Sequence, residues 1–469
     1  LASFNITVTD DLESTTTQAI NLTITPAPTP EPTPEPEPEP EPDVDTGFII
    51  VTPTPSASDD DEPSETDSQN TAESQTITNT SATQSGSAAL VQNSGNNANV
   101  VTAALPPGVS ILSEGSVIAQ STTAAQDTLI ASIDTRDSSS ETELINAAVS
   151  FVQLLSPTSR VDVRSITPTT TSTAPAQPIV IKGSDDNDSA SGSQTEAFVI
   201  DLRQMPSAAP TQLQLHNIDY TVIIGPAEIT GGSGSNIVYA DNAPQLIILG
   251  ADDDTLDGGG GNDTIGSAAG DDLLIGGQGR DLITGGADND TLQGGSQADT
   301  LTGGSGDDSL SGNQGHDTLQ GSSGDDILNG DSKHDLLKGG RGNDSPFGGK
   351  GKDTLQGSSG DDVLNGDARR DLLKGGSGND SLFGGKGKDT LIGGDGADIF
   401  VLSSKKDTID DFSIADGDVI EAPDNRNLRL IQSVNYLLLK DLGNNIKTTL
   451  LNVNSDDLAK PTRSNYLSN

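Results

Sequence analysis

The chain has 469 residues and a formal charge of −46, because 70 Asp and Glu face only 24 Lys and Arg. Aromatic residues make up 3% of it, Trp is absent, and the 53 Gly far outnumber the 8 Phe and 4 Tyr. This composition excludes a conventional large core and disfavours nucleic acid and anionic lipid as partners. A cationic ligand is favoured, because it would relieve the self-repulsion of a compact acidic chain.

Other classes are excluded by what the sequence lacks. Without Cys, it can form neither disulfides nor thiolate metal sites. No apolar run reaches about 18 residues, so we expect no membrane span. The opening residues LASFNITVTD include neither an initiator Met nor a charged-then-apolar leader, and we expect the chain to be a fragment of a longer protein.

Residues 1–25 contain two stretches in which apolar and polar residues alternate. They are Phe4–Thr9 and Ala19–Thr25, and the period of two predicts half-buried strands. Two strands are too few for a stable domain. These residues resemble the last hairpin of the cadherin-like or immunoglobulin-like repeats of large bacterial adhesins.

Residues 26–98 are predicted to be a disordered linker. Residues 26–43 are dominated by Pro and Glu, which favours an extended, charge-stiffened polyproline II spacer over a ligand motif for another protein. Residues 52–98 are rich in Ser, Thr, Asn, Gln and Asp, so they are not expected to bury a core.

Residues 99–230 regain apolar content and predict a small mixed α/β domain. A helix is expected between Ser140 and Pro157, because Ser140 and Glu143 fit a capping box ahead of an apolar stripe. Strands are expected at Pro178–Lys182, Ala197–Leu202, Gln212–His216 and Tyr220–Ile224.

A nine-residue repeat dominates the chain from Gly258 onwards. The sequence reads GGGGNDTIG, SAAGDDLLI, GGQGRDLIT and so on, and Asp recurs at the sixth place of each repeat from Asp254 to Asp407. Two places after each Asp stands an aliphatic or aromatic residue, with Pro346 as the one exception. A flexible Gly- and Asp-rich linker, the alternative interpretation, requires neither the fixed phase nor the apolar residue.

The residue types of this repeat favour calcium. Gly at places one, two and four allows positive φ and tight turns that direct carbonyl oxygens to one side. The neighbouring Asp adds a hard anionic oxygen, and calcium accepts such mixed oxygen ligands in a flexible geometry. The triplet around the eighth place forms a short strand whose middle side chain points inward.

These residues resemble the RTX, or haemolysin-type, calcium-binding nonapeptide GGxGxDxUx, in which U is a large apolar residue. The resemblance implies a mainly β fold: a right-handed parallel β-roll with two nonapeptides per coil over residues 231–410, preceded by the disordered linkers and the small mixed α/β domain. Asp residues 18 apart would stack on one edge and bind multiple Ca²⁺ ions between successive coils. The predicted metal ligands are Asp254, Asp263, Asp272, Asp281, Asp290, Asp299, Asp308, Asp317, Asp326, Asp335, Asp344, Asp353, Asp362, Asp371, Asp380, Asp389 and Asp398, with Gly259, Gly261, Gly270, Gly277, Gly279, Gly304, Gly306, Gly340, Gly342, Gly376 and Gly378.

Both ends of the predicted roll are expected to be capped. Near Gly231 the template fits with Asn236 and Gln245 in place of Asp, which predicts a calcium-free first coil. After the array, residues 411–469 resemble the closing segment of RTX proteins, which implies a β cap and the type I secretion signal. Its strands are expected around Leu428–Ile431, Tyr436–Leu439 and Thr448–Leu451.

The two edges of the predicted roll differ in the residue that precedes each motif Asp. On the first edge, that of Asp254, this residue is Asp253, Asp271, Asn289, Asp307, Asp325, Asn343, Asp361, Asn379 and Ala397. On the second edge, that of Asp263, it is Asn262, Arg280, Ala298, His316, His334, Lys352, Arg370, Lys388 and Lys406. Lys333, Arg369 and Lys405 also replace Gly at place four of the second edge. The hypothesis is that the first edge holds the tighter calcium column; drift at solvated positions is the alternative.

A recent duplication lengthens the array. Residues 320–355 and 356–391 are nearly identical, and these 36 residues make two whole coils. Copying them therefore extends the roll without breaking it. Pro346, where the second copy has Leu382, is expected to leave a local packing defect.

Two functions from different classes follow. The first is calcium binding by a secreted, extracellular module that folds on Ca²⁺ after type I secretion, in a structural or adhesive cell-surface protein. Its partners would be calcium ions, transiently the exporter, and other cell-surface or matrix components. The second is the export and folding module of a secreted hydrolase or toxin whose catalytic domain lies upstream. The chain itself is not expected to be an enzyme, because HExxH, GxSxG and P-loop motifs are absent and two of its three His, His316 and His334, lie in the array while His216 lies in a strand-like run.

Overall fold

The structure is a computed structural model that describes residues 4–9, 15–20, 49–54, 72–81, 84–90, 101–116, 119–134, 140–170, 175, 177–183, 194–206, 211–216, 218–231, 234–401, 407–421, 428–432, 437–441, 447–450 and 467–468. The chain comprises two units, Leu1–Asp45 and Thr46–Asn469. In the first unit, β1 (Phe4–Thr9) and β2 (Thr15–Ile20) form an antiparallel hairpin that pairs Phe4 with Ile20. β1 confirms the first predicted strand, whereas β2 begins at Thr15 instead of Ala19.

The second unit begins with strands in the stretch predicted to be a linker. They are β3 (Ile49–Thr54), β4 (Ala72–Asn79) and β5 (Gly86–Ala89). Ile77 of β4 and Leu90 are buried in the main core, so the linker prediction is wrong for these described residues. The few apolar residues here alternate with Ser and Thr, as in a half-buried strand. The composition of the whole stretch is polar on average, and it therefore does not reveal this local alternation.

An antiparallel layer continues from these strands. It comprises β6 (Thr102–Leu105), β7 (Val109–Ser116), β8 (Gln120–Ser121) and the long β9 (Arg160–Thr170). β7 pairs with β4 on one side and with β9 on the other, and β6 pairs with β5 and β10 (Ile179–Lys182). The layer is thereby hydrogen-bonded to both sheets of the solenoid that follows, through β9 to one sheet and through β6 and β10 to the other.

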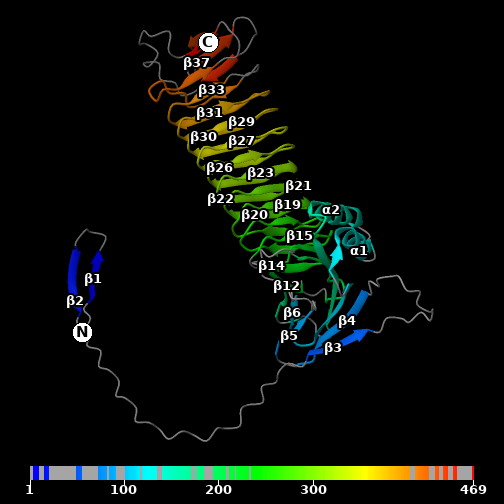
Figure 1. Cartoon of the computed structure of the whole chain (residues 1–469). Coiled ribbons are helices and arrows are strands. Elements are labelled where there is room, and N and C mark those ends of the chain that lie inside the picture. The colour runs from blue at the N-terminus through cyan, green and yellow to red at the C-terminus, as the bar shows by residue number, and fades with distance from the viewer. Residues whose placement is uncertain are drawn as a thin grey trace. The chain divides into compact units, whose positions relative to one another are not determined.

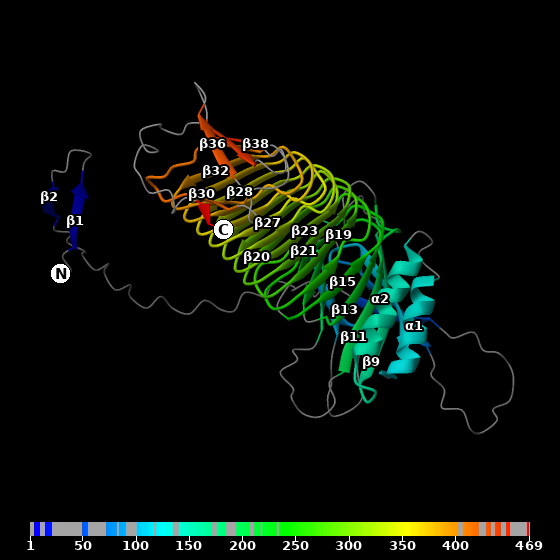
Figure 2. The ribbon, with the colours of Figure 1, turned by 90° about the horizontal axis from the view of Figure 1, so that it is seen from above.

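Two helices cover this end of the solenoid. α2 (Glu141–Leu154) confirms the predicted helix, but the capping box is wrong: the Ser140 carbonyl accepts the Glu143 and Leu144 N–H groups at 3.0 and 3.1 Å, and its hydroxyl makes no capping bond. α1 (Thr122–Asp134) was missed by the sequence analysis, because its apolar residues lie among Thr, Gln and Ser. Both helices pack on the outer face of the sheet (Figure 2), where the Phe151 and Tyr220 rings stack with centroids 4.3 Å apart.

The solenoid consists of two parallel sheets that wind around one core (Figure 1). The first sheet contains β11 (Gln194–Asp201), β13 (Tyr220–Ile224), β15 (Ile237–Ala240), β17 (Thr255–Asp257), β19 (Leu273–Gln278), β21 (Thr291–Ser296), β23 (Ser309–Gln314), β25 (Ile327–Asn329), β27 (Ser345–Phe347), β29 (Val363–Asn365), β31 (Ser381–Phe383), β33 (Ile399–Val401) and β35 (Val419–Glu421). The second contains β12 (Thr211–His216), β14 (Ala227–Gly231), β16 (Leu246–Ile248), β18 (Thr264–Gly266), β20 (Leu282–Ala287), β22 (Thr300–Ser305), β24 (Thr318–Ser323), β26 (Leu336–Arg341), β28 (Thr354–Ser359), β30 (Leu372–Ser377), β32 (Thr390–Asp395) and β34 (Thr408–Ile409).

Parallel pairing starts upstream of the predicted first coil. β11 pairs with β9, and β12 with β10, before Gly231 is reached. The offset between paired residues settles at 18 only with Ile229↔Ile247 and Val238↔Leu256, and it holds from there to β34. The strands predicted between residues 178 and 224 are therefore the first, irregular turns of the same solenoid, and the repeat takes over from them without a break in the core.

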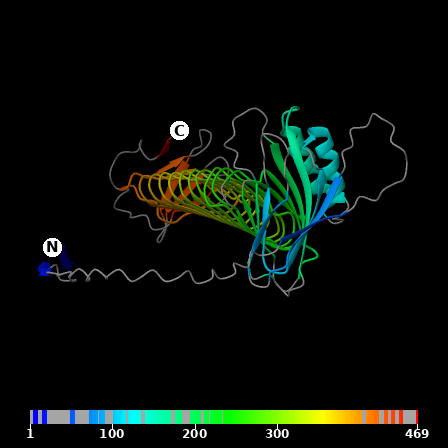
Figure 3. The ribbon, with the colours of Figure 1, turned by 60° about the horizontal axis from the view of Figure 1, so that its bottom comes forward.

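The backbone of the solenoid winds in successive coils around one interior (Figure 3), and a single file of apolar side chains per sheet fills that interior. The eighth-place residues Leu256, Ile265, Leu274 and Ile283, and their successors up to Ile409, are almost completely buried. They alternate with exposed neighbours, because successive strand side chains point to opposite faces. The core is consequently continuous but thin.

The C-terminal end of the solenoid is covered by short strands. β36 (Leu428–Gln432), β37 (Leu437–Asp441) and β38 (Lys447–Leu450) pair antiparallel, and β38 also pairs parallel with β34. These strands agree with the three predicted for the cap. β39 (Leu467–Ser468) pairs with β35, and the Phe400 and Phe412 rings meet with centroids 6.1 Å apart at this end.

No helix among the described residues is long and apolar enough to cross a membrane.

Pro346 interrupts the hydrogen-bonded ladder between coils because it lacks an N–H donor, and not because its side chain packs badly. It lies in β27 with its side chain buried, and it pairs in register with Leu328 of the preceding coil. Towards the following coil, however, only Phe347↔Asn365 remains, whereas the equivalent pairing in the duplicate, of β31 with β33, covers three residues. Proline has no N–H to give to that neighbour. The expected packing defect is thus a pairing defect.

Replacing Pro346 should therefore stabilise the roll. We expect Pro346→Leu to raise the free energy of unfolding by about 1 kcal/mol, because it restores one ladder hydrogen bond and fills the site as Leu382 does in the duplicate. The matched variant Leu382→Pro should lower it by at least about the same amount. Urea unfolding followed by circular dichroism in calcium measures both, and a stabilising Leu382→Pro would contradict the explanation.

Candidate metal centre

The motif Asp residues form two columns, one on each edge of the solenoid. All the predicted ligands from Asp254 to Asp398 are between 0% and 4% exposed. In each column the backbone N–H of one Asp donates to Oδ1 of the Asp one coil later, at 2.8–3.2 Å. The offset of 18 residues thus aligns carboxylates as strictly as it aligns the core.

The other carboxylate oxygen, Oδ2, is buried and has no hydrogen-bond partner in most of these residues. This holds within the described part of the chain for Asp263, Asp272, Asp281, Asp290, Asp299, Asp308, Asp317, Asp326, Asp335, Asp344, Asp353, Asp362, Asp371, Asp380 and Asp398. A Cβ placed on Gly276 would lie 2.6 Å from Oδ2 of Asp281, so the glycine at place one leaves room for this oxygen. A buried anionic oxygen without a partner is costly. The columns therefore require a bound cation or a proton.

Main-chain carbonyls stand beside each column. Every glycine predicted to contribute a ligand has a positive φ. At Gly277 (φ 99°) an added Cβ would overlap the Gly259 carbonyl oxygen, and at Gly279 (φ 148°) it would overlap that of Gly261. The carbonyls of one coil thus lie directly against the turn of the next. The Gly259 oxygen accepts the Gln278 N–H at 2.9 Å and keeps a second lone pair.

This set of oxygens fits calcium. No group of three or more His, Cys, Asp or Glu side chains close enough to hold a metal occurs among the described residues. Side chains alone therefore do not complete a site. Calcium takes six to eight oxygens in a flexible geometry, and backbone carbonyls are among its usual ligands. The aligned Asp residues, supplemented by the carbonyls of the turns, are the residues that would hold it.

Burial raises the pKa of the column carboxyl groups, and neighbouring Asp residues in the column raise several of them further. The backbone N–H that each receives acts in the opposite direction and is outweighed. The pKa is about 8 for Asp263. It is about 7 for Asp290, Asp299, Asp317, Asp326, Asp335, Asp371 and Asp380. It is about 6 for Asp254, Asp308, Asp344, Asp353 and Asp362, and it is raised for Asp272, Asp281 and Asp398.

One column member escaped the sequence analysis. Asp418 continues the first column, because its Oδ1 accepts the Asp398 N–H at 3.1 Å, and burial raises its pKa to about 6. It lies 20 residues after Asp398, so the fixed spacing could not find it. The sequence signal that remained was an Asp directly before the apolar triplet of β35.

Neutral amides head both columns, where a calcium-free coil was predicted. Asn236 occupies the first position of the first column, and its N–H and its Nδ2 both donate to Oδ1 of Asp254, at 2.7 and 3.3 Å. Gln245 heads the second column and donates its Nε2 to the Gly225 carbonyl at 3.2 Å. Both amides donate hydrogen bonds, which an ionised carboxylate cannot do: Gln245 donates to the chain upstream, and Asn236 donates to Gly234 and Asp254.

The two edges carry different outer ladders. On the first edge the residue before each Asp accepts from the next coil, as Oδ1 of Asp307 does from the Asp325 N–H at 2.7 Å. On the second edge Nδ1 of His334 accepts the Lys352 N–H at 2.9 Å. His316 and Lys333 act on Asp317 to lower its pKa, against the larger effect of burial. These two side chains therefore partly compensate the Asp317 carboxylate of the second column. Lys405 and Lys406 lie outside the described residues, and the difference in calcium affinity between the edges stays a prediction.

Comparison with known protein families agrees with this geometry. The family described as the RTX calcium-binding nonapeptide repeat (4 copies) matches residues 230–265, 239–274, 266–301, 284–319, 302–337, 311–346, 320–355, 339–373 and 365–400. No curated protein matches the chain. The fold and the columns define a calcium-binding parallel β-roll. Its repeats are RTX repeats, and the matched residues contain every predicted Asp ligand.

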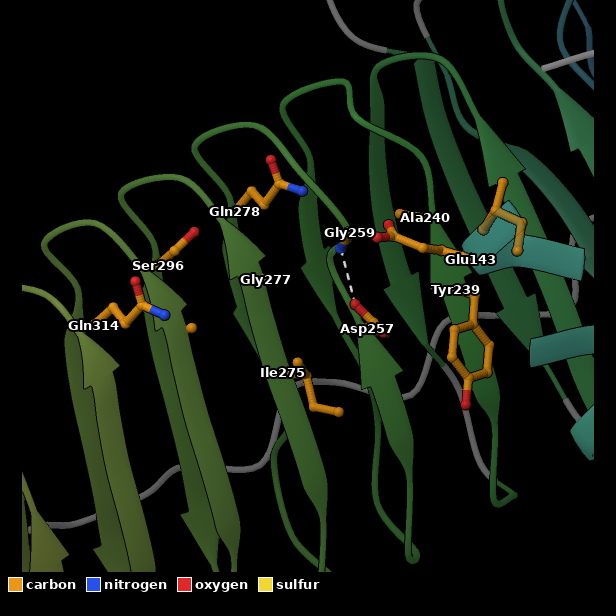
Figure 4. Close-up of a pocket in the computed structure, with 12 residues that line it drawn as sticks. Glu143, Tyr239, Ala240, Asp257, Gly259, Ile275, Gly277, Gln278, Ser296 and Gln314 are labelled. Atoms are coloured by element: carbon orange, nitrogen blue, oxygen red, sulfur yellow. Dashed lines mark hydrogen bonds between the residues drawn. The ribbon is translucent and has the colours of Figure 1, made fainter. Parts of the chain in front are cut away.

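A separate cavity of about 360 Å³ lies where α2 meets the first sheet (Figure 4). Glu143 of α2 faces Asp257 and Tyr239, while Gln278 and Gln314 line the far side. Burial, and then the Glu143 carboxylate, raise the pKa of Asp257. These two carboxylates are the only charged side chains among the described residues that line the cavity. The cavity therefore suits a cation or a neutral polar molecule and disfavours an anion.

Removing one carboxylate from a column should remove calcium. We expect Asp308→Asn on the first edge to lower both the number of bound ions and the free energy of unfolding in calcium, the latter by about 2 kcal/mol. Asn keeps the Oδ1 acceptor that Asp290 uses, so the hydrogen-bonded ladder stays intact. Asp299→Asn is the matched variant on the second edge and should remove a weaker site. Calorimetric titration that finds unchanged binding in both variants would contradict the assignment, and equal losses would contradict the difference between the edges.

The metal-free roll should lose stability as the pH rises. The folded carboxyl groups titrate near 6 to 8 instead of their ordinary 3.8, so between about pH 4 and pH 7 the folded state binds more protons than the unfolded state. This stabilisation is complete below about pH 4 and is lost as the pH rises through the folded pKa values. In saturating calcium the dependence should reverse, because protons then compete with the ion. Urea unfolding at a series of pH values, with and without calcium, measures both slopes; equal slopes would refute the assignment.

Proposed function

We propose that the chain binds multiple calcium ions in an extracellular β-roll that folds when calcium binds. The observation that carries the proposal is the pair of columns of buried carboxylates, most of which have an Oδ2 atom without a partner in the described part of the chain. Carbonyl oxygens from the positive-φ turns stand beside them and would complete each site. Asp254 to Asp398 would supply the charge, and the glycine turns the neutral ligands.

Calcium would supply folding free energy that the thin core does not. One apolar side chain is buried per nonapeptide, and the aligned carboxylates repel one another when ionised. An ion that binds only the folded state stabilises that state by mass action. The chain would therefore stay unfolded where calcium is scarce and fold where calcium is plentiful.

The proposed setting is outside the cell. RTX repeats are typical of secreted proteins, and an unfolded, calcium-poor chain is suited to passage through a type I exporter. Residues 1–25 resemble the last hairpin of an adhesin repeat. We therefore propose a structural or adhesive role at the cell surface, with surface or matrix components as partners, and a binding role for this chain instead of a catalytic one. A hydrolase or toxin upstream of residue 1 is the second candidate.

Calcium titration of the metal-free protein tests the proposal. Circular dichroism at neutral pH should show little parallel β structure in excess chelator and a cooperative gain as calcium reaches the millimolar range. Magnesium at equal concentration is the control, because it demands an octahedral site and keeps its waters, and should give little gain. A chain that is already fully β-rich in chelator would refute the coupling of folding to calcium.

A further inference from the structure

Exposed cations gather on one edge of this acidic chain. They lie at places three to five of the second-edge turns in four successive coils, and together with His334 we call them the basic ridge: Lys333, Lys350, Lys352, Arg369, Arg370, Lys386 and Lys388. All are exposed, whereas the carboxylates of the same turns, Asp335 to Asp389, are buried beneath them. Asp331 and Asp367 lie in the same turns, so seven Lys and Arg face two Asp there, and the surface of this edge is basic in these coils although the chain carries −46.

The fold arranges these cations in a row. Parallel bridges join Ser332 to Lys350, Lys350 to Ala368 and Ala368 to Lys386, which aligns the third places of consecutive turns. Neighbouring strands lie about 4.8 Å apart, so each coil adds its cations at that interval. The ridge is a straight, periodic row along the axis of the solenoid.

The charges of the ridge are available to a partner. None of these Lys and Arg side chains forms an ion pair with a carboxylate in the described part of the chain. Arg203 shows the alternative, because it binds Asp201 at 2.8 Å. A row of unpaired cations repels itself, and an anionic ligand would relieve that repulsion.

Two ridge cations stand at strained positions. Lys333 has a φ of 86° and Arg369 a φ of 96°, at place four of the repeat, where the template has Gly. Positive φ is unfavourable for residues with a Cβ, and Gly would adopt it without strain. Backbone strain that persists in a folded protein commonly marks a functional position.

The internal duplication provides an independent observation. Between the two copies Lys333 corresponds to Arg369 and His334 to Arg370, so the ridge changed residue types and kept or gained charge. On the first edge Arg341 corresponds to Ser377, and the charge was lost there. Drift alone gives no reason for this difference between the edges.

We propose that the basic ridge binds a linear acidic polysaccharide whose sugar units carry carboxylate or sulfate groups. Such a chain presents one row of separated anionic groups, which matches a row of cations repeated once per coil. Arg369 and Arg370 can bind carboxylate or sulfate oxygens in a bidentate manner. A double-stranded nucleic acid fits less well, because its charges lie about 1.7 Å apart along the axis and the acidic remainder of the chain repels it. A single strand would need stacking aromatic residues, and the ridge offers only His334.

The ridge exists only on the folded roll, so this inference rests on the calcium-dependent folding proposed above. The test uses the full chain in millimolar calcium, with circular dichroism recorded on every sample. The probes are a short oligogalacturonate, which carries carboxylates, and heparin, which carries sulfates; a short DNA duplex is the third arm. The ridge variant replaces Lys350, Lys352, Lys386 and Lys388 with Gln. The matched control replaces Arg280, Lys338, Arg341 and Lys374 with Gln, which removes the same charge away from the ridge.

We expect the unmodified chain to bind at least one polysaccharide, with an affinity that falls as salt rises. The ridge variant should lose about ten-fold in affinity or more, and the control less than about two-fold, with the calcium-induced dichroism unchanged in both. A folded chain that binds neither polysaccharide, a control that loses as much as the ridge variant, or tighter binding of the DNA duplex would each overturn the proposal. A chain that gains no dichroism in calcium would instead contradict the proposed folding function first.

Discussion

The structure depends on one constraint, the offset of 18 residues between successive coils. This offset places residues of the same type directly above one another. For the eighth-place residues this is favourable, because Leu274 lies on Leu256 and both leave water. For the sixth-place residues it is unfavourable, because carboxylates are buried in two columns and most of the described ones have one unpaired oxygen. The same register therefore creates both the core and the charge that opposes it. Neither can be altered alone, since a shift of register would displace both at once.

This constraint explains why the two ends are built differently from the middle. Each regular coil buries one apolar residue per nine, which leaves little to offset the conformational entropy of ordering the turns. At the N-terminal end, helices α1 and α2 and the stacked Phe151 and Tyr220 rings add a conventional core. Asn236 and Gln245 end the carboxylate columns there with groups that need no ion. At the other end the Phe400 and Phe412 rings and the β36–β38 strands cover the last coil.

The sequence predicted the parts of the structure that repeat and missed those that depend on context. A fixed phase of nine identified every Asp up to Asp398 as a column member, and the alternating runs located β10 to β13. Asp418 was missed because an insertion moves it off the period, although the register still delivers it to the column. β4 and α1 were missed because both segments are rich in Thr, Ser and Gln. These residues give neither an apolar composition nor a clear apolar period, and they become half-buried only against neighbouring strands. The capping box failed because Ser140 has φ −110° and ψ 4°, outside the extended conformation usual for an N-cap residue, and its hydroxyl makes no capping hydrogen bond.

The second edge shows how the outer turn residues can change while the inner column stays. On the first edge the outer residues are mostly Asp and Asn, which accept backbone N–H groups and add to the negative field around the ions. On the second edge cations occupy these places in four coils, above an Asp column that is complete. A cation there weakens the attraction of the site for calcium, and Lys333 and Arg369 also strain the backbone. Both costs fall on the stability of the roll, although Lys333 also partly compensates the Asp317 carboxylate. Binding to an external partner is what would offset these costs. Calcium itself would strengthen that binding, because each bound ion neutralises the carboxylates beneath the row and leaves the positive charge of the row less opposed.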